Sequence, residues 1–122
     1  MIIGIGTDII EIERVRKAVG RDNFLQKVFT AAEQNYCNSR GKQSAASYAA
    51  RFSAKEAFFK AIGTGIFTAL TEVEVQNNSQ GQPEIFLHGK SKKIAQDKGV
   101  EKIFLSLTHS KDFANAVVVL EK

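Results

Sequence analysis

Hydrophobic and polar positions divide the chain into apolar runs and helical stretches separated by turn signals. The first run, Ile2 to Ile10, is β-branched and punctuated by glycine, which is typical of a buried strand. An amphipathic stretch from Glu11 to Val19 follows and stops at Gly20. Apolar residues recur at helical spacing from Phe24 to Phe29 and lead into the capping box Thr30-Ala31-Ala32-Glu33. The first third is therefore predicted to be one strand followed by short helices.

The longest predicted element runs from Ser44 to Ile62. This stretch is rich in alanine and contains neither glycine nor proline. Gly63 and Gly65 follow it, and glycine is the usual residue just beyond a helix. We therefore expect one long helix that ends at these glycines.

The second half of the sequence is rich in strand patterns. Glu72 to Gln76 and Glu84 to Leu87 are strand-like runs joined by a turn-forming segment, and a short helix is predicted over Lys90 to Lys98. Two further apolar runs, Lys102 to Thr108 and Phe113 to Leu120, flank a polar turn. This order predicts an α+β fold with a mainly antiparallel sheet packed against one long helix and several short ones.

Length and composition restrict the class of protein. A chain of 122 residues corresponds to a single domain over residues 1–122. With 43% hydrophobic and 25% charged residues, the composition is that of a soluble globular protein rather than a disordered, collagen-like or membrane-spanning one. The apolar start is interrupted by Asp8, which does not fit a signal peptide or transmembrane helix. Cys37 is the single cysteine, which excludes an intrachain disulfide; this fits a cytoplasmic protein and also a secreted protein without disulfide bonds.

The charge balance favours anionic partners. Seventeen Lys and Arg residues against thirteen Asp and Glu give a net charge of +4. Phosphate-bearing ligands, nucleic acid and acidic proteins all fit this charge. Charge alone does not distinguish among these three classes of partner.

Asp8 is a candidate functional carboxylate at the end of the first apolar run. Gly4 and Gly6 precede it and permit close approach of a ligand or of another backbone. A carboxylate at this place costs desolvation energy unless a positive group compensates it. Equally, Asp8 or Thr7 could cap the helix that follows.

Glu56 is a second candidate, on the long predicted helix. Phe52, Glu56 and Lys60 recur at i, i+4 steps along one face. The simple interpretation is an exposed Glu-to-Lys pair that contributes roughly 0.2–0.5 kcal/mol. Phe52 and Phe59 flank Glu56, however, which indicates a face that is not fully solvated.

The candidate residues suit magnesium and phosphate. Two carboxylates from different elements, without a His or Cys cluster, suit Mg²⁺ and suit zinc poorly. Arg51, Lys55 and Lys60 would supply cationic donors for phosphate oxygens. His109 could meet a phosphate or only stabilise its turn. The Gly63-Thr64-Gly65 segment could contact phosphate, but a helix C-terminus has the wrong dipole for anions, so ending the helix is its first role.

Three motifs together resemble the holo-acyl-carrier-protein synthase family of phosphopantetheinyl transferases. They occur in the family's order and at its separations, and the resemblance covers nearly the whole chain. The motifs are Gly4-Ile5-Gly6-Thr7-Asp8-Ile9, Arg51-Phe52-Ser53-Ala54-Lys55-Glu56-Ala57 with Lys60 and Gly63-Thr64-Gly65, and Ser106-Leu107-Thr108-His109.

The resemblance implies a reaction and a set of site residues. The family moves the 4′-phosphopantetheine group from coenzyme A to a serine of acyl carrier protein, with Mg²⁺, and releases 3′,5′-ADP; this step serves fatty acid biosynthesis. Asp8 and Glu56 would hold the metal, and either could take the serine proton. Lys60 would neutralise the phosphate under attack. Lys42, Arg51 and His109 would contact the phosphates of coenzyme A. The family also implies a homotrimer with active sites between subunits.

A basic stretch near the N-terminus could bind the acidic carrier protein. Its charged residues alternate with apolar ones, which suits an acidic amphipathic helix with an apolar centre. A solvated basic helix face is the alternative. The residues are Arg14, Arg16, Lys17, Arg21 and Lys27, interleaved with Val15, Phe24, Leu25 and Val28.

Two other functions compete with this interpretation. A nucleic-acid-binding module would fit the charge, but the nine phenylalanines fall at core-like spacing rather than among Arg and Lys on a strand face, and no recognised motif is present. A non-enzymatic oligomeric domain would give Asp8 and Glu56 structural roles only. We expect neither nucleic acid nor a membrane as a partner.

Overall fold

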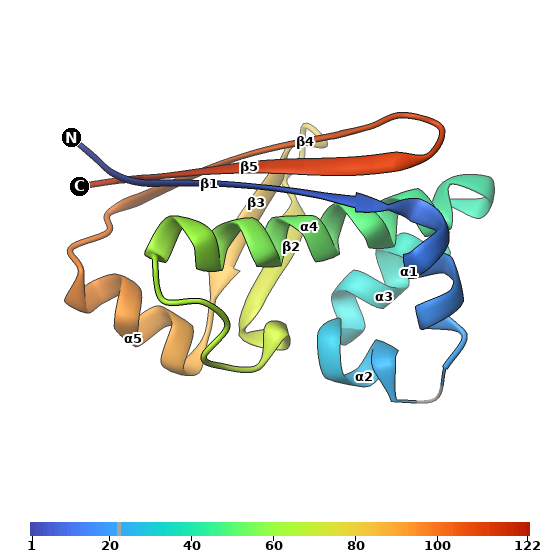
Figure 1. The fold of residues 1–122 in the computed structure, drawn as a ribbon, viewed down its shortest axis with the longest axis horizontal. Helices are drawn as coiled ribbons and strands as arrows, with labels where there is room; N and C mark the ends of the chain where they lie inside the picture. The colour runs from blue at the N-terminus through green and yellow to red at the C-terminus, as the bar shows by residue number, and fades with distance from the viewer. Residues whose placement is uncertain (22) are drawn as a thin grey trace.

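A computed structural model describes residues 1–21 and 23–122. Both termini lie at one end of the molecule, where the N-terminal ammonium donates to the carbonyl of Lys122 at 3.0 Å (Figure 1). Two one-turn 3₁₀ helices, Gly41–Gln43 and Leu70–Glu72, accompany the main elements. These are, in chain order, β1 (Ile2–Glu11), α1 (Ile12–Val19), α2 (Phe24–Val28), α3 (Ala31–Asn38), α4 (Ser44–Ile62), β2 (Val73–Asn77), β3 (Pro83–Leu87), α5 (Gly89–Asp97), β4 (Lys102–His109) and β5 (Phe113–Glu121).

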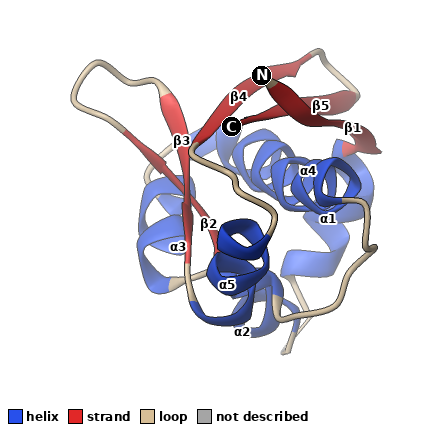
Figure 2. Cartoon of the chain, turned by 90° about the vertical axis from the view of Figure 1, so that its left-hand side faces the viewer, coloured by secondary structure: helices blue, strands red, loops and turns tan. Residues whose placement is uncertain are grey.

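The strands form two antiparallel sheets. One has the order β1-β5-β4, and the other is the β2-β3 hairpin. Figures 1 and 2 show the three-stranded sheet lying over α4, with the hairpin on another side of that helix and β3 next to β4. The α+β class predicted from the sequence is confirmed, but its mainly antiparallel sheet is divided in two.

Two glycines bring β1 into direct contact with α4. A Cβ atom on Gly6 would overlap the main-chain oxygen of Ala57 and lie 2.6 Å from the nitrogen of Ala61. A Cβ atom on Gly4 would overlap the Ala61 oxygen. The two glycines therefore allow the backbones of β1 and α4 to pack closely. This packing places Asp8 directly over the helix.

Helix α4 is the centre of the core because apolar residues cover it nearly all round. Its bounds match the predicted helix, and it ends at Gly63, whose φ of 85° is the left-handed conformation that glycine adopts without strain. Phe58 belongs to a core cluster under the sheets, and Tyr48 to a second cluster under α1 to α3. Among the described helices, none is both long and apolar enough to cross a membrane.

Local signals account for the other helix ends. The capping box is present: the Thr30 hydroxyl accepts from the Glu33 N–H, and the Glu33 carboxylate accepts from the Thr30 N–H. Helix α1 begins at Ile12, and its N-cap is Glu11. The alternative in which Asp8 or Thr7 caps this helix is therefore wrong.

Candidate functional site

Asp8 lies where β1 crosses α4, and its carboxylate is held from two sides. Its side chain is 16% exposed, and the Lys60 ammonium, which is 56% exposed, lies 3.2 Å from its Oδ1 atom. The Ser53 hydroxyl lies 3.0 Å from its Oδ2 atom. The buried carboxylate thus has the positive neighbour that its position requires.

Glu56 completes an acidic pair with Asp8. Ser53, Glu56 and Lys60 occupy positions i, i+3 and i+7 of α4, which share one face of a helix. Partial burial, followed by repulsion from the Asp8 charge, raises the pKa of the Glu56 carboxyl, and Lys60 only partly opposes the shift. The interpretation of Glu56 and Lys60 as a mere surface pair does not hold, because the structure pairs Lys60 with Asp8.

The two carboxylates fit a divalent cation. No cluster of three or more His, Cys, Asp and Glu residues that could cage a metal occurs in the described part of the chain. Magnesium is usually bound by one or two carboxylates, with phosphate oxygens and water completing its shell. Two acidic side chains that repel each other could therefore hold Mg²⁺ together with a phosphate ligand.

A basic cavity of about 380 Å³ lies between α4, α3 and the β2-β3 hairpin. Arg51 is 3% exposed at its wall, donates to the Asn77 side chain at 2.6 Å, and stacks over the Tyr36 ring at 4.2 Å. Its buried Nε atom has no hydrogen-bond partner among the described residues. His109 lines the same cavity. A rigid, partly unsatisfied guanidinium in a cavity is suited to an anionic ligand.

A second cavity, of about 370 Å³, continues the first along the end of β4. Gln43 and His109 line both cavities, and Lys42 lines the second. Gly63 and Gly65 lie instead at the far end of α4, both exposed and both at positive φ. The structure therefore brings Lys42, Arg51 and His109 into one region. Gly63 and Gly65 lie outside this region and turn the chain after α4.

The structure corrects the assignment of Lys55 to phosphate binding. Its ammonium is fully buried, pairs with Glu33 at 2.9 Å, and donates to the carbonyls of Leu70 at 3.0 Å and Val73 at 2.7 Å. All three of its N–H donors are thus engaged inside the protein. Burial lowers the pKa of Lys55, while Glu33 acts in the opposite direction. Lys55 joins α4 to α3 and β2 and does not face a ligand.

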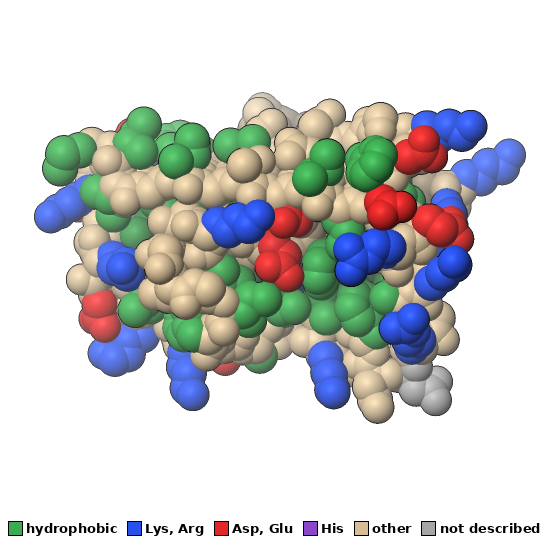
Figure 3. Space-filling view, in the orientation of Figure 1, with side chains coloured by type: hydrophobic (Ala, Val, Ile, Leu, Met, Phe, Trp, Pro, Cys, Tyr) green, Lys and Arg blue, Asp and Glu red, His purple; other side chains and the backbone are tan. Residues whose placement is uncertain are grey.

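Five of the nine residues predicted to bind the partner line a groove of about 350 Å³, whereas Arg16, Lys27 and Val28 lie outside it. Leu25 packs into the core cluster under α1 to α3 and lies outside the groove, whereas Phe52 contributes to it. Figure 3 shows acidic side chains near the middle of one face, next to basic side chains and an apolar area. The groove is lined by Ile10, Arg14, Val15, Lys17, Ala18, Arg21, Phe24 and Phe52.

Several residues of the site were not found from the sequence. Ser53 lies one turn before Glu56, a spacing that could have indicated its position. Asn115, whose side chain donates to the Asp8 carbonyl at 2.7 Å, comes from β5 and had no local signal. Tyr36 and Asn77 join Arg51 only through the tertiary fold.

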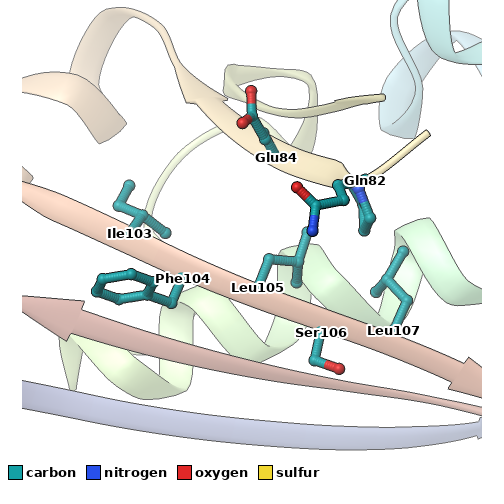
Figure 4. Close-up of a pocket in the computed structure, with 8 residues that line it drawn as sticks. Gln82, Glu84, Ile103, Phe104, Leu105, Ser106 and Leu107 are labelled. Carbon is teal, nitrogen blue, oxygen red and sulfur yellow. The ribbon is translucent and has the colours of Figure 1, made fainter. Parts of the chain in front are cut away.

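A further cavity of similar size adjoins the Arg51 cavity, with which it shares Pro83 and Leu107. It measures about 390 Å³ and lies between β4 and the β2-β3 hairpin (Figure 4). Its wall includes Ile103, Leu105 and Leu107, together with Gln82 and the acidic side chain of Glu84. This cavity combines neither paired carboxylates nor a cation, so we place the functional site at Asp8 and Glu56.

Comparisons with known proteins show which family the chain is similar to. A holo-[acyl-carrier-protein] synthase of Geotalea daltonii is 44% identical over 126 aligned positions that span both chains completely. The Neisseria meningitidis enzyme of that name has a TM-score of 0.89 and 34% identity over the whole of both chains. A Bacillus anthracis enzyme, crystallised in complex with coenzyme A (3′,5′-ADP), has a TM-score of 0.81 and 36% identity over 98% of this chain and 96% of its own.

A sequence model of a protein family also matches the chain. The model of the 4′-phosphopantetheinyl transferase superfamily matches residues 4–118. The matched region contains Asp8, Glu56, Lys60 and His109. The chain belongs to this superfamily and, within it, to the holo-[acyl-carrier-protein] synthases.

Proposed function

We propose that this protein transfers the 4′-phosphopantetheine group of coenzyme A to a serine of apo-acyl carrier protein and releases 3′,5′-ADP. The observation that carries the proposal is the arrangement of Asp8, Glu56 and Lys60 across the β1-α4 contact, in a chain of this family. In the reaction, the serine oxygen forms a bond to the phosphorus of the pantetheine phosphate, and the bond to the departing 3′,5′-ADP breaks.

Asp8 and Glu56 would hold the Mg²⁺ ion that this reaction requires. When bound, the ion supplies charge neutralisation for the pyrophosphate and the leaving group. Glu56 or Asp8 would accept the serine proton as general base. Lys60 is exposed enough to donate to a phosphate oxygen while staying close to Asp8.

The basic cavities would hold the remaining phosphates of coenzyme A. Arg51 offers a guanidinium held at the cavity wall by Asn77 and Tyr36, and Lys42 and His109 offer exposed donors along the continuation of the cavity. Charge-assisted hydrogen bonds of this kind favour anionic ligands. The Bacillus anthracis relative forms a complex with coenzyme A (3′,5′-ADP), which supports the same ligand class for this chain.

The groove formed by α1, α2 and Phe52 would receive the carrier protein. Arg14, Lys17 and Arg21 surround an apolar floor that contains Phe24. This combination complements an acidic helix with an apolar centre. Because Ile10 and Phe52 line the groove two and four positions from Asp8 and Glu56, a carrier bound there would bring its serine to the acidic pair.

An oligomer would explain the outer face of the three-stranded sheet. Ile5, Ile9 and Phe104 project away from α4 and are 68%, 64% and 50% exposed. An apolar area of this kind on a strand face is typical of an interface. We propose the homotrimer that the family implies, with this face between subunits; light scattering should then give three times the mass of the chain.

Release of 3′,5′-ADP tests the reaction. Chromatography of a mixture of the protein, coenzyme A, Mg²⁺ and apo-acyl carrier protein should show 3′,5′-ADP appearing in proportion to carrier protein consumed. Omission of the carrier, or addition of EDTA, should prevent it. Release of 3′,5′-ADP without carrier protein would indicate hydrolysis of coenzyme A instead of transfer.

A further inference from the structure

The hydroxyl of Ser53 is a fully buried polar group at the acidic pair. Ser53 is 0% exposed on α4, and its Oγ atom lies 2.8 Å from the main-chain oxygen of Asp8 and 3.0 Å from Asp8 Oδ2. A serine hydroxyl has one proton to donate, so it can serve one of these two acceptors at full strength.

Asn115 gives one of these two acceptors a donor of its own. It lies on β5, next to the residue that faces Asp8 across the sheet, and its side-chain N–H donates to the Asp8 main-chain oxygen at 2.7 Å. Because the carboxylate is charged and is the stronger acceptor, and because the main-chain oxygen already has the Asn115 donor, the Ser53 proton is favoured at Oδ2. The Asn115 amide thus holds the backbone of Asp8, and the Ser53 hydroxyl holds its carboxylate.

The two oxygens of Asp8 are therefore held in different ways. Oδ2 contacts the hydroxyl of a buried residue, whose position is set by the core. Oδ1 contacts the ammonium of Lys60, whose side chain is 56% exposed and long enough to move. A cation could replace Lys60 at Oδ1 without disturbing Oδ2.

We propose that Ser53 is a positioning residue that presets the Asp8 carboxylate for cation binding, with Asn115 directing the Ser53 proton to it. The inference rests on the proposed function, because it concerns the same acidic pair. Hydrogen bonds to a ligating carboxylate orient it and reduce the ordering required when the metal binds. Removal of such a partner typically weakens metal affinity by roughly 10–100-fold.

A purely structural role for Ser53 predicts a different outcome. If the hydroxyl only joined β1 to α4, its loss would lower stability and leave cation binding unchanged. Ser91 provides the matched control, since it is also 0% exposed and its hydroxyl bonds to two carbonyls, those of Glu72 at 2.7 Å and His88 at 2.8 Å. These contacts hold the start of α5 and involve neither β1 nor α4.

The test compares Ser53→Ala with Ser91→Ala. Mn²⁺ would be titrated into each protein in the presence of coenzyme A, without carrier protein, and followed by electron paramagnetic resonance. We expect about tenfold weaker Mn²⁺ binding in Ser53→Ala and unchanged binding in Ser91→Ala. In turnover, Ser53→Ala should need more Mg²⁺ for half-maximal rate and approach the wild-type rate at saturating Mg²⁺. Binding within twofold of wild type would overturn the inference.

Two further variants separate this inference from the proposed function. Asn115→Ala should also weaken Mn²⁺ binding, because the Ser53 proton can then turn to the main-chain oxygen. Asp8→Asn should bind Mn²⁺ much more weakly than wild type. If Asp8→Asn binds normally, the metal site itself is wrong; if Asp8→Asn loses binding while Ser53→Ala keeps it, only the positioning role fails.

Discussion

The ammonium of Lys60 lies 3.2 Å from Asp8 Oδ1, although the two residues are 52 positions apart in the sequence. This contact joins the end of β1 to the last turns of α4. It also means that the residue proposed to neutralise the phosphate occupies a carboxylate oxygen proposed to bind the metal. The ammonium and the cation therefore compete for Oδ1, and this competition has measurable consequences.

Replacement of Lys60 by methionine should separate catalysis from metal binding. We expect the rate constant for transfer to fall by roughly 10²–10³-fold, as for loss of one electrostatic donor in a water-excluded site. Mn²⁺ affinity should stay the same or rise, because a competing cation is removed. Lys93→Met on α5, where Lys93 is 78% exposed, is the control and should leave both quantities unchanged. A normal rate in Lys60→Met would exclude Lys60 from the reaction.

Replacement of Glu56 by glutamine should abolish transfer and stabilise the metal-free fold at neutral pH. The pKa of this carboxyl is raised above 4.5 in the folded protein, so the protonated form favours folding. That contribution is complete below pH 4.5 and is lost as the pH rises through the raised pKa. Urea unfolding from pH 7 downward should show Glu56→Gln as the more stable protein at pH 7 and the two curves converging toward pH 4.5. A constant difference would contradict the shift.

Magnesium should reverse this order of stability. A cation that binds the folded acidic pair raises the free energy of unfolding of the wild type. Glu56→Gln lacks one ligand and should gain less. Thermal unfolding with and without Mg²⁺ and coenzyme A measures both effects, and equal gains in the two proteins would argue against Glu56 as a ligand.

Replacement of Gly6 by alanine should destabilise the protein by about 3 kcal/mol or more. The added Cβ atom would overlap the Ala57 oxygen, and neither backbone can move without disturbing the β1-α4 contact. Gly20→Ala is the control, because Gly20 has a φ of −78° and its added Cβ atom would lie 3.4 Å from the nearest oxygen. Chemical denaturation measures both, and similar stabilities would contradict the close packing.

Charge reversal at Arg14 should weaken use of the carrier protein and leave coenzyme A unaffected. Arg14→Glu introduces repulsion at the groove, so we expect KM for acyl carrier protein to rise by about tenfold at low salt, and by less at high salt. Lys27→Glu makes the same change on α2, outside the groove residues. Equal effects of the two variants would show that overall charge, and not the groove, recruits the carrier.

Loss of the Lys55 ammonium should damage the fold and spare the site. Lys55→Met leaves the buried Glu33 carboxylate without its ion pair, which typically costs about 3–5 kcal/mol. At a temperature where the variant remains folded, KM for coenzyme A should equal that of wild type. A raised KM for coenzyme A with unchanged stability would indicate that Lys55 contacts the phosphates after all.

The parts of the fold that depend on local signals were predictable from the sequence. Helix α4 matches its predicted bounds because an alanine-rich stretch and Gly63 specify both its extent and its end. The capping box at Thr30 is equally local. By contrast, the separation of the strands into two sheets depends on which strands meet in space, and alternation within each strand contains no such information.

The candidate site was predictable in its acidic and basic residues but not in their surroundings. Lys55 was misplaced because α4 is apolar nearly all round, so its periodicity does not distinguish a buried from an exposed lysine next to Glu56. Asn115 reaches Asp8 from the last strand, across 107 positions of sequence. Such long-range partners follow from the tertiary fold, and no spacing rule indicates them.

Mass spectrometry of apo-acyl carrier protein tests the central claim most directly. The carrier would be incubated with this protein, coenzyme A and Mg²⁺, with parallel samples that contain EDTA or the Asp8→Asn variant. We predict a gain of one phosphopantetheine mass on the carrier serine in the complete mixture and no gain in either parallel sample. An unmodified carrier in the complete mixture, with folded protein and a carrier that a known synthase modifies, would contradict the proposed function.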